Sequence, residues 1–444
     1  MKSIMTRVAI TLITMAMSVA ACGNDDNNEE STNGNEVQQP AMTEPTQPEL
    51  PTDLSLTRSE QELVERSNDF AFRLASRVCD PGCFGTNADR RNGIISPLSI
   101  TFVLGMLNNG ATGETQQQIN KVLGFGDTGA AGINNYCYKL LTTVEKLDSQ
   151  TQVYIANTIY VNKGFALQPQ FVSLAKSFYN AEPESRDFND GKTMDVINQW
   201  ASDHTAGMID EVLDESTFNP FYVSYLLNAV YFKGTWTKKF NKQLTHNEAF
   251  TRATWDGKED QIVLPIMRQM DKFDYGEDDN FQAVSLPYGN GNFRMTILLP
   301  KLPQKYERSI VPNIPTSETF SRLLKQMETT TVYLKLPKFE TETEIDLKGI
   351  MWDLGMPKAF SPTEAEFSLF CNEPTYIDLL KQNARIQLDE EKTEAAAVTK
   401  DGMDGKDGPT PKFVTFYATR PFLYVIHERT TGAIFFIGNY TGRE

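Results

Sequence analysis

Hydrophobic positions along the chain predict helices mainly in its first half and strands mainly in its second. The apolar residues of 61–78 recur at a broadly helical spacing, so we expect a helix there. A short strand at 94–97 should end at its proline and lead into a helix that stops at Gly110. Apolar-rich runs typical of buried strands occupy 153–161 and 226–232. Further strands are expected at 293–299, 331–336, 384–388, 422–426 and 434–437. This order of patterns indicates an α+β fold.

Residues 1–21 have the pattern of an export signal. Lys2 and Arg7 precede an uncharged, mostly small and apolar run at 8–21, which is shorter than the ~20 residues that a membrane-spanning helix needs. The run closes with Val-Ala-Ala-Cys, which resembles the lipobox of bacterial lipoproteins and implies cleavage before Cys22 and lipidation of its thiol. The alternative is an ordinary cleaved signal with an unmodified cysteine.

Residues 22–54 form a polar, acidic segment. From Gly23 to Leu54 the chain has no aromatic and no basic residue, so it cannot bury enough apolar surface to fold and should be a flexible tether. Its opening at 23–30 looks like the acidic export signals of some Gram-negative lipoproteins. That likeness implies a lipid-anchored position on the bacterial outer membrane or cell surface. A periplasmic orientation, with a tether that has no sorting role, stays open.

The charge balance excludes some classes of protein. The 444 residues carry 58 acidic and 42 basic side chains, a net charge of −16, which argues against a nucleic-acid-binding protein. An apolar share of 40% is enough for a sizeable core. No second low-complexity linker follows the tether, so 55–444 should be a single domain. The three histidines lie far apart, so we expect no metal and no cofactor.

The cysteines and the catalytic motifs point away from an enzyme. Cys79 and Cys83 flank the turn-forming Asp-Pro-Gly, so we expect a local disulfide in an oxidising compartment, with two free thiols as the alternative. Cys137 and Cys371 stand alone, so no second ligand pair completes a metal site. The body contains no nucleophile elbow, no P-loop and no His-Glu-x-x-His, and we expect no enzymatic activity.

Ordered sequence blocks, spread over the whole predicted domain, resemble the serpin family of serine protease inhibitors. The most specific early block is Leu-Asn-Ala-Val-Tyr-Phe-Lys-Gly-Thr-Trp at 227–236. Asn-Gly-Ile-Ile-Ser-Pro-Leu-Ser-Ile at 92–100 resembles the family's buried strand-to-helix turn. Further matching blocks lie at 107–115, 197–200, 205–209, 286–288, 336–339, 354–356 and 420–424, with Gly438 near the end.

The resemblance implies a fold and a mechanism. The fold would be an α+β single domain with N-terminal helices, large mixed β-sheets and an exposed C-terminal reactive loop at about 390–415. The protein would be a monomeric inhibitor that works by suicide-substrate trapping. A serine protease, or a cysteine protease as the second class, attacks the loop and forms an acyl-enzyme. The cut loop then inserts into the main sheet as a new strand.

The segment 390–399 resembles the hinge of that loop. Its alanines would by themselves favour a helix. With period-two alternation the segment can instead be a strand whose inward side chains are Thr393, Ala395, Ala397 and Thr399, all small enough to slide between two existing strands. The predicted hinge residues are Glu390, Glu391, Lys392, Thr393, Glu394, Ala395, Ala396, Ala397, Val398 and Thr399.

The reactive bond is predicted between Lys406 and Asp407. Counting the family's usual 17 residues with Glu390 as the first reaches Lys406, whereas counting back from Pro421 lands near Thr410. The forward count is preferred, because the sheet fixes the length of the inserted strand, whereas extra loop residues after the reactive bond cost little free energy. A lysine there implies a trypsin-like or otherwise lysine-specific protease. Rival cut sites are Lys400, Met403 and Lys412.

The chain departs from the family pattern at several positions. Lys392 stands where the hinge usually has glycine, and Asp401 would bring an inward carboxylate into the inserted strand. Thr419 replaces the acidic or amide residue expected before Arg420. Gln382 stands where many relatives have a histidine that pins the central strands, and glutamine can also hydrogen-bond there. The predicted sheet-opening region is Ser96, Ser99, Asn228, Trp236 and Gln382.

Two other functions stay open. Lys392 favours a non-inhibitory serpin fold that acts as a cleavable substrate or binding module. The other hypothesis is a surface lipoprotein that binds glycans or peptides through exposed aromatic side chains.

Overall fold

The computed structural model describes residues 54–79, 92–253, 259–301, 314–390 and 413–442. In these residues the α-helices are α1 (Arg58–Val78), α2 (Pro97–Asn108), α3 (Gly113–Leu123), α4 (Gly129–Leu147), α5 (Pro169–Tyr179), α6 (Thr193–His204), α7 (Ser317–Gln326) and α8 (Lys348–Leu354). Short 3-10 helices are η1 (Gly126–Thr128), η2 (Lys242–Leu244) and η3 (Pro357–Phe360). Within the described part of the chain, no helix is long and apolar enough to cross a membrane.

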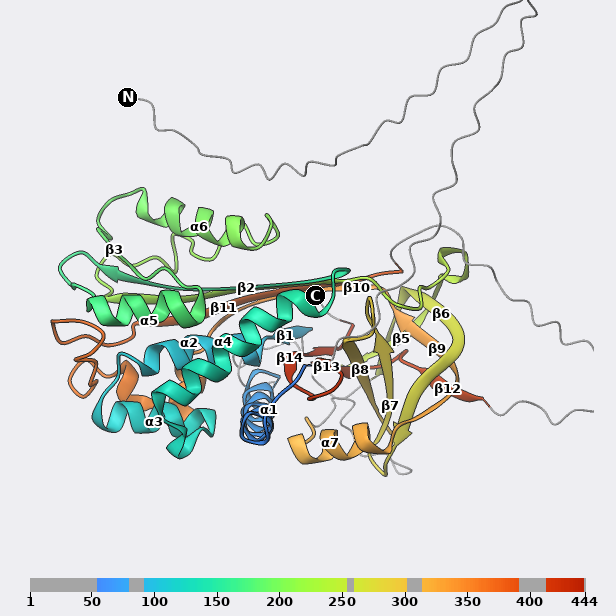
Figure 1. Ribbon diagram of the computed structural model, residues 1–444. Coiled ribbons are helices and arrows are strands. Elements are labelled where there is room, and N and C mark those ends of the chain that lie inside the picture. The colour runs from blue at the N-terminus through green and yellow to red at the C-terminus, as the bar shows by residue number, and fades with distance from the viewer. Residues whose placement is uncertain (1–53, 80–91, 254–258, 302–313, 391–412, 443–444) are drawn as a thin grey trace, which may run out of the picture. The chain divides into compact units, whose positions relative to one another are not determined.

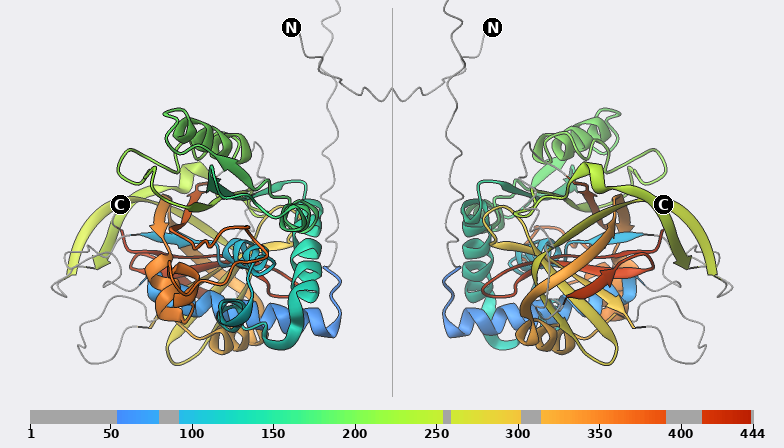
Figure 2. Two further views of the ribbon diagram at one scale, coloured as in Figure 1. Left: turned by 90° about the vertical axis from the view of Figure 1, so that its left-hand side faces the viewer. Right: turned by 90° about the vertical axis from the view of Figure 1, so that its right-hand side faces the viewer.

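A five-stranded sheet forms the first layer of strands. Its order is β10 (Phe339–Asp346), β11 (Leu379–Leu388), β4 (Ser224–Gly234), β2 (Thr151–Asn162) and β3 (Glu184–Arg186). Helix α6 covers one face of this sheet and α2 lies on the other (Figures 1 and 2). Residues 224–232 are buried without interruption, because β4 lies in the middle of the sheet with a layer on each face.

A larger sheet of nine strands lies beside it. Its order is β1 (Gly93–Ile95), β14 (Ile434–Tyr440), β13 (Phe422–Glu428), β8 (Phe293–Pro300), β7 (Phe281–Pro287), β6 (Glu259–Glu277), β9 (Glu328–Pro337) and β12 (Val414–Tyr417), and β5 (His246–Ala253) pairs with β6. The fold is therefore α+β, with two mixed sheets, as the sequence predicts.

The start of α2 differs slightly from the sequence prediction. The strand expected at 94–97 ends at Ile95, because Ser96 caps α2 and Pro97 occupies its first turn. The Ser96 side chain accepts a hydrogen bond from the backbone N–H of Ser99, and proline suits a first turn, where no intrahelical N–H bond is lost. Every residue of α2 is buried, so this helix is the centre of the core.

The chain enters the core before α1 begins. Leu54, the last residue of the predicted tether, is only 3% exposed and belongs to the main hydrophobic cluster. Thr57 and Glu60 then form a capping box at the start of α1.

Candidate functional site

The site begins with the central pair of strands in the five-stranded sheet. β11 and β4 are parallel and directly hydrogen-bonded, in register from Leu379 opposite Tyr225 to Ile386 opposite Phe232. β11 leads to Glu390, where the predicted loop starts, and the chain returns at β12 on the edge of the nine-stranded sheet. The loop therefore connects the middle of one sheet to the edge of the other.

This pairing determines what the segment after β11 can do. Because β11 and β4 run in the same direction, a chain that reverses after β11 is antiparallel to both. If the β11–β4 ladder opens, such a segment gains an antiparallel ladder on each side, and antiparallel pairing is slightly more stable per residue than the parallel pairing it replaces. The geometry therefore allows a strand to be added here, directly before the predicted loop.

A buried polar cluster links these two strands to the start of α2. The Gln382 side chain accepts from the backbone N–H of Ser96 at 2.9 Å and donates to the Ser96 carbonyl at 3.1 Å. Gln382 also donates to the side-chain oxygen of Asn228, whose own amide donates to Ser99. The structure thus brings together four of the five predicted sheet-opening residues.

Asn157 of β2 is a fifth member of this cluster, and the sequence analysis did not identify it. Its side-chain oxygen accepts from the Asn228 amide at 2.7 Å and from the Ser99 hydroxyl at 3.5 Å. Asn157 lies opposite Asn228 in the register of β2 and β4. Asn157 could have been recognised from the sequence, because it is an asparagine within the apolar-rich run 153–161 and a buried amide needs a hydrogen-bond partner.

Trp236 lies apart from that cluster, at the end of β4. Its indole N–H donates to the carbonyl of Asp389 at 2.9 Å, and its ring stacks on Tyr288 with centroids 4.2 Å apart. Trp236 therefore fixes the chain where β11 ends and the predicted hinge begins.

Glu390 is the hinge residue that the structure describes, and it is anchored. It accepts hydrogen bonds from the Thr245 hydroxyl at 2.8 Å and from the Lys338 ammonium at 3.0 Å. The residue is 6% exposed. Burial raises the pKa of its carboxyl, but the hydrogen bonds from Thr245 and Lys338 outweigh burial and hold that pKa below its ordinary value.

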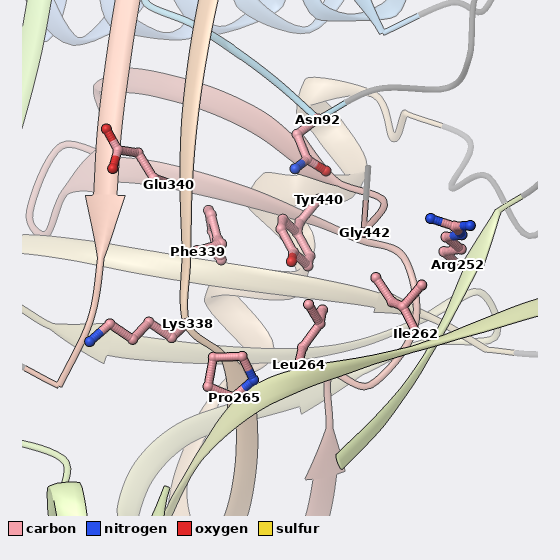
Figure 3. A pocket seen from close by; sticks show the side chains of 10 residues that line it. All are labelled: Asn92, Arg252, Ile262, Leu264, Pro265, Lys338, Phe339, Glu340, Tyr440 and Gly442. Atoms are coloured by element: carbon pink, nitrogen blue, oxygen red, sulfur yellow. The ribbon is translucent and has the colours of Figure 1, made fainter. Parts of the chain in front are cut away.

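Lys338 also borders a cavity of about 590 Å³ next to this anchor. Figure 3 shows Lys338 at one end of the cavity and Arg252 at the other, with Phe339 and Tyr440 between them. The rings of Phe339 and Tyr440 stack with centroids 4.4 Å apart. The lining also includes Glu340 and Asn92, so the cavity is of mixed polarity, and its Lys338 is the cation that binds Glu390.

Most of the other predicted site residues lie outside the described residues. These are Cys22, Cys83, Glu391 to Thr399, Lys400, Asp401, Met403, Lys406, Asp407, Thr410 and Lys412. Cys79 directly follows α1, and because Cys83 is not described, the pairing of the two cysteines stays a prediction. Cys137 is a buried free thiol, and burial raises its pKa to about 12, which makes it unreactive. The Thr419 carbonyl accepts from the backbone N–H of Thr251.

Comparisons with known proteins agree on one family. A sequence model described as Serpin (serine protease inhibitor) matches residues 65–442. An uncharacterised serpin-like protein of Thermococcus kodakarensis is 29% identical over 443 residues, which are 98% of each chain. The glia-derived nexin of Rattus norvegicus is 31% identical over 355 residues, 78% of this chain and 86% of the relative.

Solved structures give the same result. Tengpin, a thermophilic serpin in its native state, aligns with a TM-score of 0.75 at 28% identity, over 89% of this chain and 97% of tengpin. Native protease nexin-1, solved with heparin, aligns with a TM-score of 0.72 at 27% identity, over 86% of this chain and 99% of that protein.

Proposed function

This chain belongs to the serpin family, and we propose that it inhibits a lysine-specific protease by trapping it with its own reactive loop. Serpins are in general protease inhibitors rather than enzymes. The observation that supports trapping here is the parallel β11–β4 pair, which accepts an antiparallel strand on both sides and directly precedes the loop.

The proposed reaction starts as ordinary proteolysis. The protease nucleophile, a serine hydroxyl in the main case, attacks the carbonyl carbon of Lys406. The bond to Asp407 breaks, the amino group of Asp407 leaves with a proton, and Lys406 is held to the protease as an ester. A lysine side chain suits a specificity pocket with a carboxylate at its base.

Insertion of the cut loop then competes with hydrolysis of the ester. Residues after Glu390 fold back between β11 and β4 and carry the attached protease along. At roughly 1 kcal/mol net per hydrogen bond, a strand of a dozen residues paired on both edges releases on the order of 10 kcal/mol. That energy is large enough to distort an active site, and the inhibitor works once.

The proposal extends to the location of the protein. Cleavage before Cys22 and lipidation of its thiol would anchor the domain to a bacterial envelope through the 22–54 tether, on the outer membrane or cell surface. A protein in that position meets proteases of a host or of neighbouring cells.

The test uses protein that begins at residue 48, mixed with trypsin. We expect a covalent adduct that survives denaturing electrophoresis and that mass spectrometry assigns to Lys406. Lys406→Ala should lose the adduct, and the matched Lys400→Ala variant should keep it. Clean cleavage with fully active trypsin would instead favour the substrate or binding-module function, with Lys392 in the hinge as the suspected cause.

A further inference from the structure

Seven basic residues lie on neighbouring segments beside both ends of the reactive loop, and we call them the basic surface. They are Lys238, Lys239, Lys242, Arg268, Lys272, Lys335 and Lys338. Three of these lysines lie in the turn 235–245 after β4, which contains no acidic residue. Lys338 binds Glu390 before the loop, and β9, which carries Lys335, pairs with β12 after the loop.

The basic surface has an excess of positive charge in an acidic protein. Arg268 and Lys335 share one carboxylate, Glu248, and Lys238 pairs with Asp271 at 2.7 Å. Asp389 and Glu390 also lie beside it, whereas the nearby carboxylates of Asp274 and Glu340 are paired with arginines outside the set, Arg294 and Arg385. Lys239, Lys242 and Lys272 are exposed and form no ion pair with a described carboxylate. The whole chain has a net charge of −16.

Exposed aromatic and methionine side chains lie on the face of the sheet that carries Arg268, Lys272 and Lys335. Met270 of β6 and Thr415 of β12 both lie opposite Tyr333 of β9, so the three share one face of the sheet. Tyr333 and Tyr417 pack edge to face at 5.6 Å, and the Lys335 ammonium lies 4.8 Å from the centre of the Tyr417 ring. Met270 is 54% exposed. Tyr, Met and Arg are enriched at protein interfaces, whereas a surface for a flexible polyanion needs only cations.

The length of the chain limits how far the predicted reactive bond can lie from this surface. Lys406 precedes Phe413 by seven residues, and an extended chain spans at most about 3.6 Å per residue, so the bond is no more than about 25 Å from Phe413. A protease domain is wider than that distance, so a protease bound at Lys406 can reach the basic surface.

We propose that the basic surface docks the acidic rim of the target protease, so that the chain selects, among lysine-specific proteases, those with acidic residues around their cleft. The proposal takes the identity of the partner from the proposed function. An acidic protease is repelled by the net charge of this chain, and a local patch of opposite sign is what offsets that repulsion at close range. Complementary charge of this kind acts chiefly on the rate of association.

The experiment compares anionic and cationic trypsins, which share a specificity pocket and differ in surface charge. The test variant is K239E/K242E/K272E, which breaks no ion pair to a described carboxylate. The matched control is K121E/K176E/K192E, which makes the same charge change at exposed positions on α3, on α5 and before α6. The rate of loop cleavage or adduct formation is followed at 50 mM and 300 mM salt.

We expect the test variant to react with anionic trypsin about tenfold more slowly than the wild type at low salt, and the difference to shrink at high salt. Cationic trypsin should react as fast as before or faster, and the control should change little with either enzyme. Equal behaviour of the two variants overturns the proposal. An effect that requires added heparin also overturns it and assigns the surface to a polyanion. Because cleavage without an adduct is still timed, failure of trapping is distinguishable from failure of docking.

Discussion

Gln382 of β11 and Asn228 of β4 face each other in register across the parallel strand pair, and the Gln382 amide donates to the Asn228 side-chain oxygen. Gln382 also bonds both backbone groups of Ser96, so one side chain ties two strands to the start of α2. Any strand that enters between β11 and β4 has to break the bond between Gln382 and Asn228 first. This bond would therefore contribute to the barrier to the proposed insertion.

Gln382→Ala should destabilise the native protein. The substitution leaves buried polar groups of Ser96 and Asn228 without a partner, and each such group costs about 1–3 kcal/mol. We expect the first unfolding transition in urea to shift by about 2–4 kcal/mol. The control is Gln387→Ala, an exposed glutamine on the same strand, which should change stability by less than about 0.5 kcal/mol. Equal losses in the two variants would contradict the role of the cluster.

Glu390 should make the hinge sensitive to acid. Its pKa in the fold lies below the ordinary value of 4.5, so its contribution to stability is present above about that pH and is lost as the pH falls through the folded value. At pH 7 Glu390→Gln should therefore lower the free energy of unfolding by about 1–3 kcal/mol. The difference in unfolding free energy between wild type and Glu390→Gln should disappear as the pH falls. A difference that stays constant from pH 7 to pH 3 would contradict a stabilising role for the ionised Glu390, and Glu373→Gln, at an exposed position, is the control.

Lys392→Gly should make trapping more efficient. A chain that inserts after β11 must reverse within a few residues, and glycine adopts tight-turn conformations that cost other residues about 1 kcal/mol. A barrier lower by that amount speeds insertion about fivefold relative to ester hydrolysis. We expect fewer moles of inhibitor to be consumed per mole of trypsin inactivated. Lys400→Gly, in the same loop, is the control, and an unchanged ratio in Lys392→Gly would show that this position does not limit insertion.

Lys406→Phe should transfer inhibition from trypsin to chymotrypsin. A phenylalanine fits a hydrophobic specificity pocket and cannot pair with the carboxylate of trypsin, so the preference should change by about 100-fold or more. The measurement is the second-order rate of inactivation of each enzyme. If Lys400→Phe or Lys412→Phe produces the switch and Lys406→Phe does not, the reactive bond lies at that other lysine.

Local patterns in the sequence predicted the two strands that form the parallel β11–β4 pair. The run 226–232 is apolar without alternation, which is typical of a strand buried on both faces, and β4 is such a strand. Gln382 contacts Ser96 and Asn228, which the sequence analysis places with it in the predicted sheet-opening region. They could be anticipated because their sequence blocks resemble a known family.

Contacts between distant segments could not be predicted. Thr245 and Lys338, which anchor Glu390, precede it by 145 and 52 residues, and neither has a local pattern that points to a hinge. β6 was also missed as a strand: it runs through Pro265 and Gly276, both unfavourable in strands, and its partners in the sheet hold it extended. The basic surface has the same origin, since its lysines come from segments that only the folded chain brings together.

The pairing of β1 with β14 has a consequence for biosynthesis. Gly93 lies opposite Asn439, so β1, the first strand of the nine-stranded sheet in the sequence, can pair only after β14 has been synthesised. A ribosome must make almost the whole chain before that edge can close. A chain that is exported before it folds needs an incomplete fold of this kind, and the export signal predicted at residues 1–21 would require one.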